Sequence, residues 1–157
     1  MHFGKTEAGI SFLDISTGEF LAAQGTIDYL GKLLQNFRPA EILFCKRNRT
    51  EFEGHFGPDF CTFALDEWVF GTDYAHDTLT RHFRTTSLKG FGVDNLKEGV
   101  IAAGCILHYL AETKHADLSA HCQPGPARRR QVRVARPLHG AQPGAGAGAA
   151  PRRRAAD

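Results

Sequence analysis

Hydrophobic and polar residues alternate over residues 9–16, and a second stretch with strand-forming residues covers residues 18–25. A period of two places successive side chains on opposite faces of a strand, as in a sheet with one buried face. A Ser-Thr-Gly sequence that ends at Gly18 separates the two stretches and is typical of a turn. The pattern predicts an antiparallel hairpin, with Gly18 as a structural residue of its turn.

The hydrophobic spacing then changes to three and four residues, which is the period of a helix. Thr26 is a candidate N-cap, and Pro39 limits the helix at its other end. The sequence therefore predicts one amphipathic helix between these two residues. Its apolar positions are Ile27, Leu30, Leu33, Leu34 and Phe37.

The middle of the chain predicts two further strands. A short apolar run at residues 41–45 is typical of a buried strand whose neighbours run parallel to it. Residues 47–57 are polar with two spaced phenylalanines and predict a short helix or an ordered loop. Residues 60–66 alternate again, so we expect the second strand there.

Residues 72–83 have helical spacing and predict a surface helix capped by Thr72 or Asp73. Trp68 precedes this helix in a loop. A large aromatic ring at such a place is predicted to anchor the loop on the domain.

The last helix, which follows Asn95, is apolar on nearly every side. Asn95 is predicted to cap it, with Glu98 reaching back to the free backbone amide in a capping box. Gly104 lies in its middle despite a cost of about 1 kcal/mol relative to alanine, so we expect tight packing of helix on strand there. Gly90 and Gly92 supply backbone freedom in the preceding turn. We interpret this helix as the central one, packed on the sheet.

The order of strands and helices gives an α/β fold class. A length of 157 residues with 42% hydrophobic residues fits one domain with a real core, which we place at residues 1–120. The sequence predicts neither a membrane span nor a signal peptide, so we expect a cytoplasmic protein. The widely spaced cysteines Cys45, Cys61 and Cys105 are expected to be reduced and buried.

Charge divides the chain near residue 121. Residues 1–120 contain 11 Lys and Arg against 16 Asp and Glu, whereas residues 121–157 contain 8 Arg against one acid, Asp157. The second segment consists mostly of Ala, Arg, Pro and Gly, a composition that cannot build a core and predicts disorder. One interpretation is a basic arm that binds nucleic-acid phosphates. The other, which we favour, is GC-rich DNA translated in a shifted frame, because these four residues have GC-rich codons.

Two patterns raise the question of catalysis. Residues 90–95, GFGVDN, lack the third glycine and the preceding strand of a dinucleotide-binding loop. Asp14 lies on the first predicted strand, where nucleases of the ribonuclease H type place a metal ligand, and Glu19, Asp66 and Asp94 are further acids. We favour a structural role in which Asp14 bonds the hairpin turn. The sequence therefore predicts no catalytic, metal-binding or cofactor-binding residue, and a metal-dependent nuclease stays the alternative.

Three stretches of the chain, taken together, resemble the connector domain of the MutS family of DNA mismatch-recognition proteins. They are residues 9–25 with DISTGEF, residues 38–45, and residues 88–121 with GFGVDN and AAGC. The resemblance covers residues 2–121. It implies a ribonuclease H-like fold, in which helices flank a mixed sheet, without the carboxylates of the nucleases.

The resemblance also implies a function. A MutS connector links mismatched-DNA binding to the ATPase domains, while DNA, ATP and Mg²⁺ are bound by the full-length protein in the bacterial cytoplasm, at the nucleoid. The implied partners are the other MutS domains and MutL, which would meet the outward face around His76, Asp77 and Thr78. Because the mismatch-reading and ATPase domains of the family are missing from this sequence, we interpret the chain as a fragment without enzymatic activity of its own.

Overall fold

Three antiparallel strands form the first sheet, in the order β1 (His2–Phe3), β2 (Ala8–Leu13) and β3 (Phe20–Gly25). The structure is a computed structural model and describes residues 1–93 and 95–115, so Asp94 and the segment 121–157 lie outside the described residues. The predicted hairpin is confirmed, with Ile10 opposite Ala23 in its register. Gly18 closes the turn with a φ of +76°, a conformation that favours glycine.

The second sheet pairs β4 (Ile42–Cys45) with β5 (Thr62–Leu65) in parallel, as predicted. All four residues of β4 are buried. The amino group of Met1 donates a hydrogen bond of 2.7 Å to the carbonyl oxygen of Leu43 and so joins the start of β1 to β4. The α/β class is confirmed, and the strands follow one another as β3-β2-β1-β4-β5 in two short sheets that meet at this bond.

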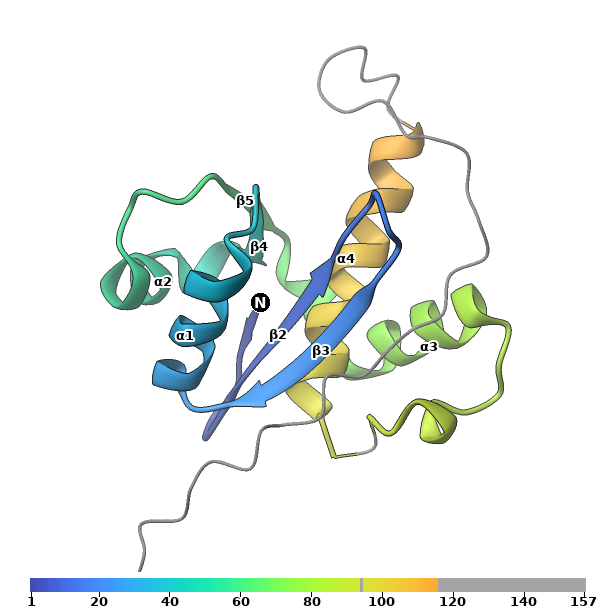
Figure 1. Ribbon diagram of the computed structural model, residues 1–157. Coiled ribbons are helices and arrows are strands. Elements are labelled where there is room, and N and C mark those ends of the chain that lie inside the picture. The colour runs from blue at the N-terminus through green and yellow to red at the C-terminus, as the bar shows by residue number, and fades with distance from the viewer. Residues whose placement is uncertain (94, 116–157) are drawn as a thin grey trace, which may run out of the picture.

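In the described part of the chain, four helices surround the strands. They are α1 (Ile27–Phe37), α2 (Arg49–Phe56), α3 (Thr72–Phe83) and α4 (Lys97–His115), and three short 3-10 segments lie at Lys46–Asn48, Glu67–Phe70 and Lys89–Phe91. Figure 1 shows α4 crossing behind β2 and β3 with α3 beside it, while α1 and α2 lie on the left of the view. No helix among the described residues has the length and apolar character to span a membrane.

Three hydrophobic clusters fill the spaces between these elements. In the first, α1 and α2 cover the strands, and the rings of Phe44 and Phe52 stack with centroids 4.9 Å apart. The second places α4 against β4 and β5 through Leu43, Leu65, Ile101 and Cys105. The third places α4 against β3 and α3 through Phe20, Leu79, Ala103 and Leu107. The prediction that α4 is the central, nearly all-apolar helix is therefore confirmed.

Glycines set the distance between α4 and its neighbours. A Cβ atom on Gly9 of β2 would lie 2.0 Å from the carbonyl carbon and oxygen of Glu98, and one on Gly99 would lie 2.9 Å from the carbonyl oxygen of Ala23. The backbones of helix and sheet therefore touch directly. A Cβ on Gly104 would lie 2.6 Å from the Cα of Ala75. The close packing predicted at Gly104 exists, but its partner is the helix α3 and not a strand.

The predicted cap of α1 is correct, and the predicted cap of α3 is wrong. Thr26 accepts a hydrogen bond of 3.3 Å from the backbone N–H of Tyr29, as predicted. The prediction of Thr72 or Asp73 as the cap of α3 is wrong, because the carbonyl of Gly71 accepts the first helical bond, 3.0 Å from the N–H of Ala75. The N–H of Gly71 already donates to the carbonyl of Trp68 in a turn, so α3 starts one residue earlier than the sequence predicted.

The predicted cap of α4 is also wrong. The carbonyl of Leu96 accepts the first helical bond, 2.7 Å from the N–H of Val100, so Asn95 lies one position too early. The side chain of Glu98 does not return to Asn95, because it contacts His2. In the preceding turn, Gly92 has a φ of +69°, whereas Gly90 has open space around it and no positive φ. Only Gly92 uses the backbone freedom of glycine.

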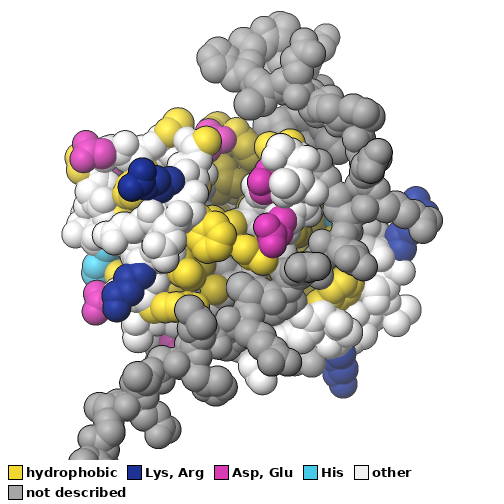
Figure 2. Space-filling model, in the orientation of Figure 1, with side chains coloured by type: hydrophobic (Ala, Val, Ile, Leu, Met, Phe, Trp, Pro, Cys, Tyr) yellow, Lys and Arg dark blue, Asp and Glu magenta, His cyan; other side chains and the backbone are white. Residues whose placement is uncertain are grey.

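One side chain predicted to be buried, that of Cys61, is exposed. Cys45 and Cys105 are buried and Cys61 is exposed, all three as free thiols. Trp68 packs its loop onto the domain as predicted, since its ring lies against Tyr74 of α3 and His108 of α4, but 59% of the residue stays exposed. In the face shown in Figure 2, hydrophobic side chains also gather where the end of α1 meets β2; there Phe12 and Phe37 stack with centroids 4.4 Å apart.

The glycine contacts generate a stability prediction. Gly9→Ala pushes a methyl group into the backbone of α4 and should lower the free energy of unfolding by about 2–3 kcal/mol. Gly54→Ala is the matched control, since Gly54 lies inside α2 with open space at its Cβ, and it should raise stability by about 0.5–1 kcal/mol. Urea denaturation of both variants measures the difference. Equal stability of Gly9→Ala and the wild type would show that the helix and sheet do not touch.

Candidate interaction surfaces

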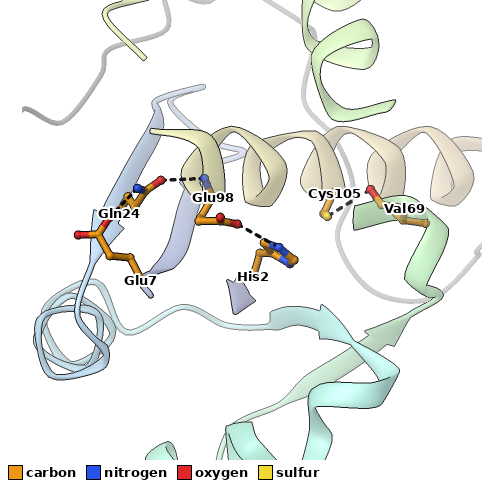
Figure 3. Close-up of polar contacts among 6 residues, drawn as sticks. All are labelled: His2, Glu7, Gln24, Val69, Glu98 and Cys105. Atoms are coloured by element: carbon orange, nitrogen blue, oxygen red, sulfur yellow. Dashed lines mark hydrogen bonds and ion pairs between the residues drawn. The ribbon is translucent and has the colours of Figure 1, made fainter. Parts of the chain in front are cut away.

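A polar network holds the first turn of α4 to the strands (Figure 3). Gln24 of β3 accepts a hydrogen bond of 2.7 Å from the backbone N–H of Glu98, and its amide group donates one of 2.7 Å to Glu7. The Glu98 carboxylate lies 3.1 Å from Nε2 of His2 on β1. The first turn of a helix has free N–H groups that need partners. Gln24 therefore takes the part that the sequence assigned to Asn95.

Burial keeps the histidine of this network neutral. Removal from water, helped by the nearby Met1 amine, Arg47 and Lys97, lowers the pKa of His2 to about 4. The contact with Glu98 therefore requires the proton on Nε2, which donates to the carboxylate. Nδ1 is then a buried acceptor, and none of the residues described donates a hydrogen bond to it. The arrangement positions the first turn of α4 against β1 and β3.

Asp14 lies at the end of the β2–β3 hairpin and bonds the turn through one carboxylate oxygen. One oxygen of its carboxylate, Oδ1, accepts hydrogen bonds from the hydroxyl of Ser16 at 2.6 Å, from the N–H of Ser16 at 2.8 Å and from the N–H of Thr17 at 3.2 Å. These bonds hold the pKa of Asp14 below its ordinary value, the Ser16 hydroxyl most of all. The predicted structural role of Asp14 in the turn is confirmed.

Of the acids considered for a nuclease site, Asp94 lies outside the described residues, and the others form no metal-binding group. Asp66 pairs with Lys46 at 2.6 Å after β5, far along the chain from the hairpin, and Glu19 is exposed. Within residues 1–93 and 95–115, no group of three or more His, Cys, Asp and Glu side chains is placed to hold a metal ion. Cys105 is no nucleophile either, since burial raises the pKa of its thiol to about 12.

The outward face of α3 carries the residues predicted to meet a partner. Ala75 and Leu79 are buried toward α4, and this orientation leaves His76 and Asp77 exposed and Thr78 half-buried. Nδ1 of His76 lies 4.0 Å from the Asp77 carboxylate. The partner contact expected at these three residues stays a prediction.

Residues 2–121 match the protein family described as MutS domain II. This chain belongs to the MutS domain II family. It is similar to the DNA mismatch repair protein MutS of Christiangramia forsetii, with 58% identity over 115 residues, which is 73% of this chain and 13% of that protein. The MutS of Cytophaga hutchinsonii is 55% identical over 119 residues, and that of Flavobacterium johnsoniae is 58% identical over 113 residues.

The chain spans 13–14% of the length of these MutS relatives. The shared part is the whole described fold, from β1 to α4. The resemblance to the MutS connector domain that the sequence indicated is confirmed at the level of the family.

The sequence did not predict the contacts of the polar network: His2 and Gln24 were not singled out, and Glu98 was assigned to a capping box. His2, Gln24 and Glu98 come from positions up to 96 residues apart, and local spacing gives no signal for such a contact. Gly9 was missed as well. Its place in an otherwise buried strand was an available signal, since an isolated strand glycine often marks a close backbone approach.

His2 makes stability depend on pH. An unfolded histidine titrates near 6.5 and His2 in the fold near 4, so the unfolded chain binds an extra proton between these values. The free energy of unfolding should fall by about 2 kcal/mol as the pH drops through this window, after allowance for solvent screening. His2→Gln, which keeps a donor for Glu98, should remove this slope, and His55→Gln, at an exposed histidine, should not. Equal slopes for His2→Gln and the wild type in urea titrations would refute the assignment.

Proposed function

We propose that this domain serves as the connector of a longer MutS protein. It links the part that recognises mismatched DNA to the ATPase part and passes changes in one to the other. The observation that carries this proposal is the match of residues 2–121 to MutS domain II, at 55–58% identity to proteins about seven times as long as the matched segment. A domain with so small a share of a repair protein acts through its neighbours.

The packing of the domain supports the same function. Direct backbone contacts at Gly9 and Gly104 leave α4 little freedom to move against the sheet or against α3. A close-packed unit transmits displacement and does not absorb it. The reactive groups Asp14 and Cys105 are committed to structure. In this proposal the domain has no catalysis and no cofactor of its own, and DNA, ATP and Mg²⁺ are bound elsewhere in the full-length protein, at the bacterial nucleoid.

The proposal includes a contact between the face His76–Asp77–Thr78 of α3 and MutL. The experiment replaces domain II of Flavobacterium johnsoniae MutS with residues 2–121 of this chain. The graft should bind mismatched DNA and couple it to ATP hydrolysis. Reversal of the helix charge with Asp77→Lys should weaken MutL capture about tenfold and leave DNA binding and basal ATPase activity unchanged.

Asp59→Lys is the matched control, because it makes the same charge change at an exposed loop position away from α3. It should leave MutL capture intact. Full MutL capture by the Asp77→Lys graft would refute the contact on α3. A graft that binds mismatches and hydrolyses ATP without any link between the two would refute the connector function.

A further inference from the structure

Five ring side chains form a surface beside the C-terminal half of α4, which we call the aromatic surface. Its members are Phe63, Trp68, Tyr74, His108 and Tyr109. They come from β5, the Glu67–Phe70 segment, α3 and α4. They form two groups: Phe63 packs on Tyr109, and Trp68 packs on Tyr74 and on His108, which is itself buried. Trp68 is 59% exposed and Phe63 is 45% exposed. So much ring area in contact with water is unfavourable unless a partner covers it.

The exposed tryptophan is held in one orientation. Its ring meets those of Tyr74 and His108 edge-on, with centroids 5.2 Å and 5.1 Å away. These two rings are themselves joined by a hydrogen bond of 2.8 Å between the Tyr74 hydroxyl and Nδ1 of His108. Among the described residues, none accepts a hydrogen bond from the Trp68 indole. A rigid aromatic group with a free donor costs little entropy to bind and is typical of interface hot spots.

Acidic side chains surround the aromatic surface. Glu41 accepts a hydrogen bond of 3.0 Å from the Tyr109 hydroxyl, Asp73 precedes Tyr74, and Glu112 lies one turn after His108. Two bases near Trp68 are already neutralised, since Lys46 pairs with Asp66 and Arg47 with Glu67. The described residues record no ion pair for Glu41, Asp73 or Glu112. The surroundings of the rings are therefore negative.

We propose that the aromatic surface binds a segment of a partner protein that carries Arg or Lys together with large apolar side chains. A cation over the Trp68 ring is attracted by its π electrons and by the acids around it. The apolar side chains cover Phe63 and Tyr109. The surface adjoins the His76–Thr78 face of α3, because Asp73 and Tyr74 lie one turn before Asp77 and Thr78. Phe63, Trp68 and Tyr109 extend it onto β5, the Glu67–Phe70 segment and α4, so this contact goes beyond the one with MutL proposed above.

The chain's own Arg-rich segment is the main competing occupant. Residues 121–157 supply 8 Arg but no Phe, Tyr, Trp or Ile. Such a segment matches the charge of the aromatic surface and leaves most of its ring area uncovered. A partner with both kinds of side chain fits better.

Fluorescence tests this proposal directly, because Trp68 is the only tryptophan of the chain. The probe is a synthetic peptide of alternating Arg and Leu, titrated into the full chain. Trp68 emission should shift to the blue and saturate, and the affinity should fall as salt is added. A peptide with Glu in place of Arg, and one with Ser in place of Leu, should each bind at least about tenfold more weakly.

Charge reversal locates the binding site. Asp73→Lys with Glu112→Lys should weaken the Arg-Leu peptide at least about tenfold and keep the circular dichroism and melting of the wild type. Asp28→Lys, at an exposed position of α1, is the control and should bind normally. Equal affinity for the Arg and Glu peptides, or no saturable change in emission, would overturn the proposal.

Two further measurements test the other possible occupants of the aromatic surface, which are residues 121–157 and a second copy of the chain. Trp68 emission of the full chain without peptide should match that of a chain ending at residue 121, and it should not depend on protein concentration. A difference between the two chains that salt removes would assign the surface to residues 121–157. A concentration-dependent shift would assign it to a second copy of the chain, and either result would overturn the proposal.

Discussion

The direct contact between the backbone of α4 and strand β2 is the constraint on which the rest of the structure depends. A Cβ at Gly9 would lie 2.0 Å from the carbonyl of Glu98, so the helix sits at a separation that a side chain would prevent. Only at this separation can Gln24 and His2 reach Glu98 and fix the first turn of the helix. The hydrophobic clusters then fill the space on either side of the place where α4 crosses the sheet.

The same helix fixes α3 by a second contact of this kind. Gly104 lies against Ala75, and both are buried. The two proposed interaction surfaces, the outward face of α3 and the aromatic surface, are thus built on elements that α4 holds. A force on either surface reaches the sheet through touching backbones, which cannot rotate away as long side chains do. This gives the proposed connector function a physical basis in the packing of one helix.

The sequence predicted the features that nearby residues determine. The hairpin, the cap at Thr26 and the bonds of Asp14 to its own turn each depend on residues within a few positions. Periodicity also located β4 and the central helix, because full burial leaves a plain apolar pattern.

What the sequence could not predict depends on distant residues. The partner of the Glu98 amide is Gln24, 74 positions away. A capping rule considers only residues next to the helix start, such as Asn95, and therefore cannot predict this contact. A helix glycine such as Gly104 signals a close neighbour and does not say whether that neighbour is a strand or a helix. The exposure of Trp68 follows from where α3 and α4 place Tyr74 and His108, which composition does not encode.

Hydrogen exchange of the backbone amides in α4 tests the central claim most directly. If the glycine contacts lock the helix to the sheet, the amides from Ile101 to Cys105 can open only when the whole domain unfolds. Their exchange should then give the same free energy as global unfolding in denaturant. Exchange of these amides through a smaller opening, with β2 and β3 still protected, would contradict the account.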